Sequence, residues 1–309
     1  MDNKIIIETD GLSKKFNDNW VLSNFDILVN KGQIYGLLGP QGSGKSIVLK
    51  ILTGLVKPTK GKFKLFGIRN SALNNKIYAR VGALIGEPSF YPYLTGKQNL
   101  IHLSSLIKDI SKSKIEEILE MVNLENQQNM KVKDYPPVFK KRLGIAQAIV
   151  HDPELLILDE PTFGLEPEGM QNIHNYIKLM VEEYDKTVLL ASHNLQEVQS
   201  LCTHMGLINY GKLVKKGSVR ELLTTSELFV TEVVVDQPRQ ALNLLLNQNW
   251  INKISMYRNK LKLHIANEKR PILTKFLVEQ GFKVYSVQSR SSVEDYYISL
   301  LRKEKFREK

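Results

Sequence analysis

The segment GPQGSGKS, from Gly39 to Ser46, constrains the fold of this chain more than any other stretch. It follows the apolar run QIYGLL and precedes IVLKILTGL, which predicts a strand, a glycine-rich loop and a helix in that order. The glycines let the loop turn tightly, so that backbone N–H groups and the positive end of the helix point at one anion. Lys45 can reach the β- and γ-phosphates of a nucleotide, and the Ser46 hydroxyl can hold Mg²⁺. The residues expected to contact the nucleotide are Gly39, Pro40, Gln41, Gly42, Ser43, Gly44, Lys45, Ser46 and Ile47.

A second segment, LLILDEP from Leu155 to Pro161, predicts an apolar strand that ends in two carboxylates. Asp159 suits Mg²⁺, directly or through water, and Glu160 can polarise the water that attacks a γ-phosphate. A solvated turn could also carry two acidic residues. That alternative does not explain why both stand at the end of an apolar strand in a chain that already holds a phosphate loop.

A third segment, TVLLASHNLQEV, predicts a buried strand over Thr187 to Ala191, followed by His193. Taken alone, this histidine would be interpreted as a packed imidazole. Beside the other two segments, we interpret His193 as a γ-phosphate sensor that also orients Glu160. The predicted catalytic residues are therefore Glu160, His193 and Lys45.

The joint occurrence of GPQGSGKS, RLGIAQAIVHDPELLILDEPTFGLEP and LLASHNLQEV resembles the nucleotide-binding subunit of an ABC transporter, over about Ile5 to Gly217. The resemblance implies an α/β P-loop ATPase domain over residues 1–217, with a RecA-like core, an antiparallel β subdomain and a helical subdomain at about 88–140. It implies ATP and Mg²⁺ as cofactors, an ATPase dimer, and a separate permease in the membrane. Phe16 stands where the family stacks an aromatic ring on adenine, and Glu166 stands where a family aspartate crosses the dimer interface.

Within the family, EPSFYPYLTGKQNL, the pattern around Tyr135 to Ala146 and the segment SSVEDYYISLL, Ser291 to Leu301, resemble the bacitracin-resistance and lantibiotic-immunity branch. That branch implies export of a peptide antibiotic or another amphipathic compound, with the ATPase lying on the cytoplasmic face of the cell membrane. The sequence has no apolar run long enough to span a bilayer. Its single cysteine, Cys202, suits a reducing compartment.

The family's signature loop, LSGGQ or a variant such as YSLGM, is replaced here by YPPVF, which comprises Tyr135, Pro136, Pro137, Val138 and Phe139. In the family, the serine and the glycine amides of this loop contact the γ-phosphate bound to the opposite subunit. Pro136 replaces the serine, each proline removes one backbone donor, and Val138 replaces the glycine of closest approach. Prolines are tolerated in the first turn of a helix, so we expect the fold to survive while the phosphate contact is weakened.

A second departure lies at VGALIGEPSF, where the family's Q-loop glutamine aligns with Gly86 and a carboxylate, Glu87, follows one position later. The sequence leaves open whether Glu87 takes over the Mg²⁺ and coupling role or the loop is weakened.

Three hypotheses follow from an intact phosphate loop beside a depleted signature: a heterodimer with a second ABC ATPase, a slow homodimer, or a non-hydrolysing regulatory relative. The alternative class is a soluble ABC ATPase that acts on nucleic acid or ribosomes. Such proteins usually carry two cassettes in one chain, and the segment LTGKQNL also favours a membrane partner. No nucleic-acid partner is therefore expected.

Residues 218–309 have a different pattern. Strands and helices are predicted in the order β-α-β-β-α-β, which suggests a small α+β domain of the ferredoxin-like type, followed by an amphipathic helix from about Ser292. From Lys215 to Lys309 there are 18 lysines and arginines against 10 aspartates and glutamates. The role of this basic domain is left open between support of a dimer and a regulatory contact at the membrane surface.

Overall fold

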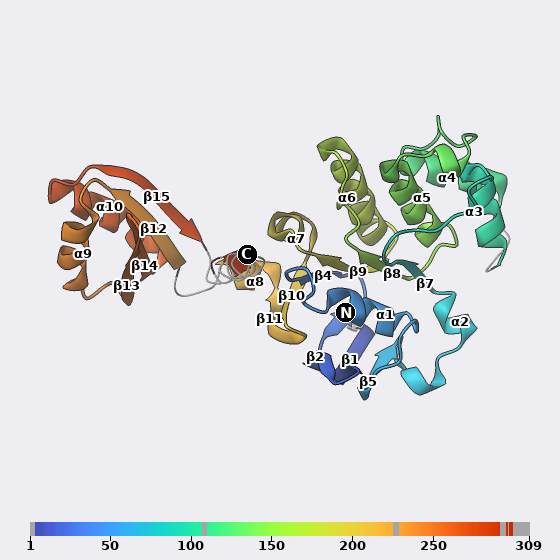
Figure 1. The fold of residues 1–309 in the computed structure, drawn as a ribbon, viewed down its shortest axis with the longest axis horizontal. Helices are drawn as coiled ribbons and strands as arrows, with labels where there is room; N and C mark the ends of the chain where they lie inside the picture. The colour runs from blue at the N-terminus through green and yellow to red at the C-terminus, as the bar shows by residue number, and fades with distance from the viewer. Residues whose placement is uncertain (1–3, 107–109, 225–228, 291–294, 296, 299–309) are drawn as a thin grey trace. The chain divides into compact units, whose positions relative to one another are not determined.

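The structure is a computed structural model, and it describes residues 4–106, 110–224, 229–290, 295, 297 and 298. The chain divides into two compact units, Met1–Gly217 and Ser218–Lys309 (Figure 1). Most of the segment SSVEDYYISLL and of the helix expected from Ser292 lies outside the described residues.

The centre of the first unit is a six-stranded sheet with the order β11-β10-β4-β9-β8-β7. Strands β4, β7, β8, β9 and β10 run parallel, which agrees with their apolar runs in the sequence, and β4 and β9 are buried along their whole length. The strand bounds are β4 Ile34–Leu38, β7 Val81–Leu84, β8 Leu155–Asp159, β9 Thr187–Ser192, β10 His204–Asn209 and β11 Lys212–Ser218.

The register of this sheet brings the carboxyl ends of three strands together. Leu38, the last residue of β4, pairs with Ser192 at the end of β9, and Asp159 at the end of β8 pairs with Ala191. In open α/β sheets, ligands bind at the carboxyl ends of the strands. The three segments singled out in the sequence therefore meet at one edge.

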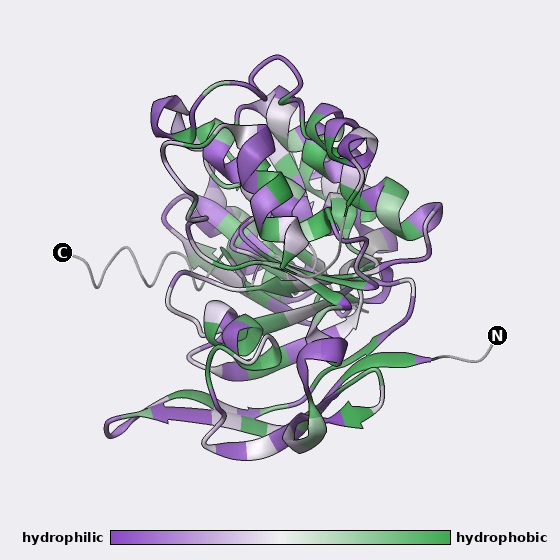
Figure 2. Cartoon of the chain, turned by 90° about the vertical axis from the view of Figure 1, so that its right-hand side faces the viewer, coloured by the Kyte–Doolittle hydropathy of each residue, from purple (hydrophilic) through white to green (hydrophobic). Residues whose placement is uncertain are grey.

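A second sheet packs against the same apolar core and forms the predicted antiparallel β subdomain. Its order is β2-β1-β5-β6, with β3 paired to β1, and these neighbouring strands run antiparallel. Its strands are β1 Ile5–Phe16, β2 Asn19–Phe25, β3 Leu28–Asn30, β5 Lys60–Leu65 and β6 Ile68–Arg69. One buried apolar cluster joins this sheet to helix α1 (Lys45–Leu52) and to β4, β8 and β9, so the phosphate loop stands on a packed core. Figure 2 shows the apolar colour concentrated along these inner strands.

Three further helices and one 3-10 turn belong to the first unit. They are α2 Asn75–Tyr78, α6 Pro167–Glu182, α7 Leu195–Leu201 and the 3-10 turn Asn70–Ala72.

The predicted helical subdomain consists of α3 (Gly96–Ser105), α4 (Lys112–Met121), the 3-10 turn Val132–Asp134 and α5 (Pro137–Ile149). Helix α3 begins with a capping box, in which the Thr95 side chain accepts from the backbone amide of Gln98 and the Gln98 side chain accepts from the backbone amide of Thr95. Helix α5 has proline in its first turn, as the sequence allows.

In the second unit, the element order is β12 (Phe229–Val235), α9 (Pro238–Leu246), β13 (Lys253–Tyr257), β14 (Lys260–Ile265), α10 (Arg270–Glu279) and β15 (Val284–Arg290), preceded by α8 (Val219–Thr224) and with a 3-10 turn at Asn267–Lys269. The sheet order is β13-β14-β12-β15, and its strands pair antiparallel. Leu261, Leu263 and Ile265 alternate along β14 and are fully buried against Leu245 of α9 and Leu277 of α10. This unit therefore has its own apolar core.

Within the parts of the chain that the structure describes, no helix has both the length and the apolar character needed to cross a bilayer.

Candidate active site

The glycine-rich loop connects β4 to α1, and its glycines occupy positions that other residues cannot take. A Cβ atom on Gly39 would lie 2.4 Å from the carbonyl oxygen of Ile208 and 2.6 Å from Ser43 Oγ. Gly42 and Gly44 have positive φ angles of 71° and 105°. Gly44 is also the N-cap of α1 and supplies no capping side chain, so the first amides of the helix have no side-chain acceptor. This arrangement suits an anion at the helix start.

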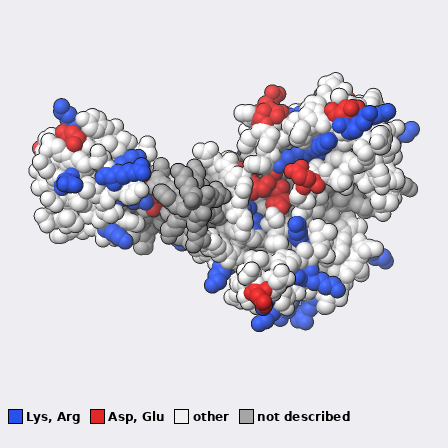
Figure 3. Space-filling model, in the orientation of Figure 1, with Lys and Arg blue, Asp and Glu red and all other residues white. Residues whose placement is uncertain are grey.

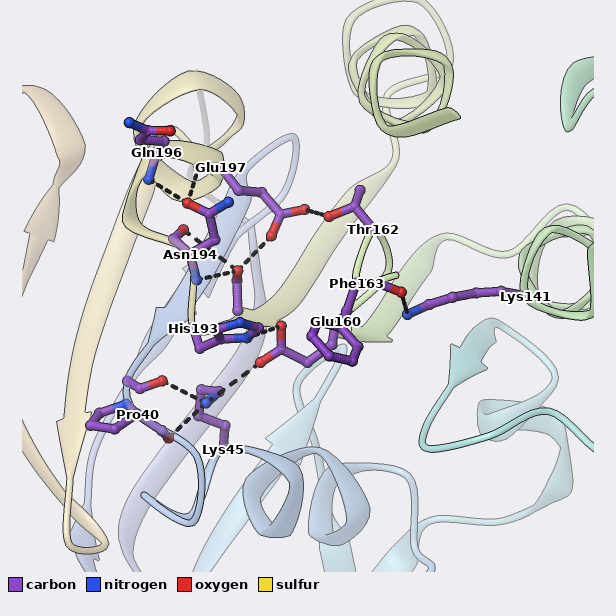
Figure 4. Close-up of polar contacts among 12 residues, drawn as sticks. Pro40, Lys45, Lys141, Glu160, Thr162, Phe163, His193, Asn194, Gln196 and Glu197 are labelled. Carbon is purple, nitrogen blue, oxygen red and sulfur yellow. Dashed lines mark hydrogen bonds and ion pairs between the residues drawn. The ribbon is translucent and has the colours of Figure 1, made fainter. Parts of the chain in front are cut away.

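Lys45 is the first residue of α1, and its side chain is buried within the loop. Its Nζ donates to the carbonyl oxygens of Gly39 at 2.6 Å and Pro40 at 2.9 Å, and it lies 3.6 Å from Glu160 Oε1 (Figure 4). The loop itself therefore orients the ammonium group toward the end of β8.

Glu160 and His193 meet at the ends of β8 and β9. His193 Nδ1 lies 2.9 Å from Glu160 Oε2, and the Glu160 amide donates to the carbonyl oxygen of Ala191 at 3.0 Å. Glu160 has a left-handed backbone with φ 49°, which costs a non-glycine residue about 1–2 kcal/mol. Figure 4 shows its carboxylate held between His193 and Lys45. With this backbone conformation, the carboxylate lies in the site. Strained backbone conformations are common at functional sites.

Asp159 could supply an oxygen ligand for a metal ion. Its Oδ1 is buried and has no hydrogen-bond partner in the structure, and an unsatisfied buried carboxylate oxygen is costly unless a ligand completes it. Ser46 lines the same cleft. Mg²⁺ prefers oxygen ligands and binds through one or two protein groups together with substrate phosphates. Asp159 and Ser46 both offer oxygen donors at this cleft, which fits Mg²⁺ bound together with a nucleotide.

These groups line one cleft of about 270 Å³. Figure 3 shows acidic side chains gathered in this part of the first unit, with basic side chains beside them on the α5 side. The lining residues are Gln41, Gly42, Lys45, Ser46, Gly86, Glu87, Lys141, Asp159, Glu160, Phe163 and His193.

A buried polar network supports the cleft from behind, and our sequence reasoning missed it. Glu197 of α7 is 3% exposed and accepts hydrogen bonds from the hydroxyls of Thr162 and, at 2.5 Å, Ser192; His174 Nε2 lies 3.2 Å away. Burial acts to raise the pKa of Glu197, but the hydrogen bonds from His174, Ser192 and Thr162 outweigh it and hold the pKa below its ordinary value. The charged carboxylate ties together α6, α7 and the segment after β8. The one feature of the sequence that could have pointed to Glu197 is its position four residues after His193, in the first turn of α7.

Several predicted site residues do not line the cleft. Phe16 lies at the end of β1, is 43% exposed, and has the Lys14 ammonium 4.8 Å from its ring centroid. Ser43 is buried inside the loop with an unpartnered hydroxyl, and Ile47 packs against the apolar core. The adenine role of Phe16 therefore stays a prediction.

The signature segment forms the start of α5. Pro136 is the N-cap and makes no side-chain cap, while the amides of Phe139 and Lys140 both donate to the Pro136 carbonyl at 3.0 and 3.2 Å. Since prolines carry no N–H, Val138 holds the one uncommitted amide among residues 136–140, all of which the structure describes. Tyr135 faces inward, and its hydroxyl donates to the Gln127 carbonyl at 2.7 Å. The segment is well folded but poor in donors.

Glu166 pairs within its own chain. Its Oε1 accepts from Arg142 Nη2 at 2.6 Å, while its side chain remains 51% exposed. The expectation that this residue crosses a dimer interface stays a prediction, and Arg142 is a contact that the sequence did not indicate.

The segment after β7 places a glycine and a carboxylate in the cleft. Gly86 has a φ of 72° and Glu87 follows it, and both line the site. Glycine has no side chain, and an ionised glutamate accepts hydrogen bonds but does not donate them. The amide donor of a Q-loop glutamine therefore has no counterpart at these two positions.

Known proteins resemble this chain in sequence and in fold. The model of the ABC transporter family matches residues 22–163. The ABC transporter ATP-binding protein YdbJ of Bacillus subtilis is 37% identical over 295 residues, which cover 95% of this chain and 94% of YdbJ. The bacitracin transport ATP-binding protein BcrA of Bacillus licheniformis is 33% identical over 301 residues, covering 96% of this chain and 97% of BcrA.

A solved dimeric structure of a bacterial ABC transporter cassette superposes with a TM-score of 0.65 at 23% sequence identity. The superposition covers 70% of this chain and 99% of the solved cassette. At this level of identity the likeness concerns the fold alone.

Proposed function

This chain belongs to the ABC transporter family of ATP-binding proteins, and from that premise we propose that it hydrolyses MgATP to drive a separate membrane permease in export. Its matched relatives include ATP-binding proteins of both bacitracin and lantibiotic transport, as the sequence resemblance predicted. The proposed cargo is a peptide antibiotic or a similar amphipathic compound. The proposed location is the cytoplasmic face of the membrane.

One observation carries the proposal: the phosphate loop, Asp159, Glu160 and His193 converge on a single cleft at the carboxyl ends of three parallel strands. A structural role does not explain an unpartnered Asp159 oxygen beside a strained Glu160. Binding of a triphosphate explains both features.

The chain's own residues would act in distinct ways. The loop amides and Lys45 would hold the β- and γ-phosphates, with the Lys45 ammonium exchanging loop carbonyls for phosphate oxygens. Glu160 would accept a proton from the attacking water, and His193 would fix the orientation of that carboxylate through the contact at 2.9 Å. Ser46 and Asp159 would hold Mg²⁺, which neutralises charge on the phosphates when bound.

The signature segment makes the proposed assembly asymmetric. In a family dimer, each nucleotide lies between one chain's phosphate loop and the other chain's signature. The α5 start offers only the Val138 amide, so a nucleotide that faces it would turn over slowly. We therefore favour a heterodimer, in which a partner ATPase supplies a complete signature to this chain's cleft; a slow homodimer is the alternative.

The test is MgATP binding and hydrolysis by the purified chain beside Lys45→Ala, with Lys62→Ala, an exposed lysine on β5, as the matched control. The proposal expects Lys45→Ala to lose MgATP binding and Lys62→Ala to behave like the starting protein. Absence of MgATP binding by the unaltered chain would contradict the proposal.

A further inference from the structure

Lys141 enters the cleft from the side opposite the phosphate loop. It belongs to α5 of the helical subdomain, whereas Lys45 and Ser46 belong to the first turn of α1. Figure 4 shows its extended side chain reaching from α5 to the segment that follows β8. Lys141 and Lys45 are the two lysines among the residues that line the cleft.

Among the described residues, the close contacts of the Lys141 ammonium are with the uncharged groups of Phe163. Nζ donates to the carbonyl oxygen of Phe163 at 2.7 Å and lies 5.6 Å from the centroid of the same ring. None of the ion pairs found within 4.0 Å among the described residues involves Lys141. An ammonium has three donors, so two donor directions are not used by the carbonyl bond.

The negative charge of the cleft also favours a second basic side chain beside Lys45. Its lining carries three carboxylates, Glu87, Asp159 and Glu160, and Glu160 already pairs with Lys45. Burial lowers the pKa of Lys141, and the negative charges of Glu87 and Glu160 act in the opposite direction. A polyphosphate entering this site adds further negative charge, which the Lys141 ammonium is placed to neutralise.

We propose that Lys141 binds the terminal phosphate of ATP in the cleft of its own chain, and so supplies the donor that Gly86 and Glu87 lack. On binding, Nζ leaves the Phe163 carbonyl for a γ-phosphate oxygen. Because α5 begins with the signature segment, this contact ties the YPPVF end of the helix to occupancy of the same chain's site. The inference rests on the proposed function and adds a γ-phosphate ligand to it.

The test compares MgATP with MgADP, since only the former has a γ-phosphate. Equilibrium binding of both nucleotides is measured by calorimetry for the full chain, for Lys141→Met, and for Lys140→Met as the neighbouring control on α5. A hydrogen bond between charged groups contributes about 1.5–3 kcal/mol, which corresponds to at least about a tenfold change in Kd. Lys141→Met is therefore expected to weaken MgATP about tenfold or more and MgADP less than about twofold. Lys140→Met is expected to change neither.

Equal losses for the two nucleotides, or no loss for either, would overturn the proposal. If Lys141→Met does not fold, as judged by thermal unfolding, Lys141→Leu serves instead, because it keeps the helix propensity but removes both the charge and the hydrogen-bond donors. The result distinguishes this proposal from the proposed function. If the unaltered chain binds no MgATP, the proposed ATPase function is contradicted. If MgATP binding stays strong in Lys141→Met, only the role of Lys141 is contradicted.

Discussion

Repair of the signature segment should speed MgATP hydrolysis in whatever dimer this chain forms with itself. The change is Pro136→Ser with Val138→Gly, which restores a hydroxyl and an N–H group at the N-cap of α5 and removes a branched side chain from its first turn. Val138 holds the one free amide of that turn at present. The side-chain oxygen of the introduced serine can accept from the amide at position 138, while its hydroxyl donates to a phosphate on the opposite chain.

The expected magnitude follows from the number of contacts regained. One charge-assisted hydrogen bond contributes about 1.5–3 kcal/mol, so turnover should rise about 10- to 150-fold. Stability should change little, because a serine cap adds about 0.5–2 kcal/mol, while the loss of proline rigidity removes about 0.4–1 kcal/mol and glycine within the helix removes up to about 0.5–1 kcal/mol. A gain in rate would therefore not reflect better folding.

The assay is steady-state phosphate release at saturating MgATP, with thermal unfolding measured on the same samples. Pro136→Ala with Val138→Gly is the matched control, since it regains the backbone donor but not the hydroxyl, and it should gain less. Unchanged turnover in a repaired variant that binds MgATP and dimerises would refute the reasoning, and would mean that YPPVF is a working variant of the signature.

Three further outcomes are expected. Asp159→Asn should leave the fold intact and raise the Mg²⁺ concentration needed for half-maximal hydrolysis about tenfold or more, measured by metal titration, because the buried oxygen loses its charge. Glu197→Gln should lower the free energy of unfolding, because the pKa of Glu197 is lowered in the folded protein and its ionised carboxylate therefore stabilises the fold. This stabilisation is fully present above the ordinary pKa of a glutamate and is lost as pH falls through the lowered pKa of the folded state, so the free energies of unfolding of variant and unaltered protein should converge in acid. Gly39→Ala should destabilise the loop by more than about 1 kcal/mol in denaturant unfolding, because its Cβ would lie 2.4 Å from the Ile208 carbonyl oxygen.

Local patterns predicted most of the fold. The phosphate loop, the strand before Asp159 and the strand before His193 are each recognisable from a run of neighbouring residues, and the parallel sheet then brings their ends together. The capping box at Thr95 is equally local, since both of its partners lie within one helix turn.

The contacts that the sequence did not reveal join segments far apart in the chain. Lys141 meets Phe163 across 22 positions, and Glu197 meets Thr162 across 35. Neither lysine nor glutamate in a helix has a local pattern that distinguishes a solvated side chain from one turned into a site. Only the packing of α5 and α7 around the end of β8 settles where these side chains lie.

Glu160 is the proposed general base of an ATP-hydrolysing cleft, and its role is tested by comparing MgATP binding and turnover for the unaltered chain and Glu160→Gln. A positioned general base accelerates a reaction about 10²–10⁴-fold. Glu160→Gln is expected to bind MgATP at least as well as the unaltered chain, because a negative charge facing the phosphates is lost, while its turnover is expected to fall at least about 100-fold. Equal turnover by the two proteins would contradict this role.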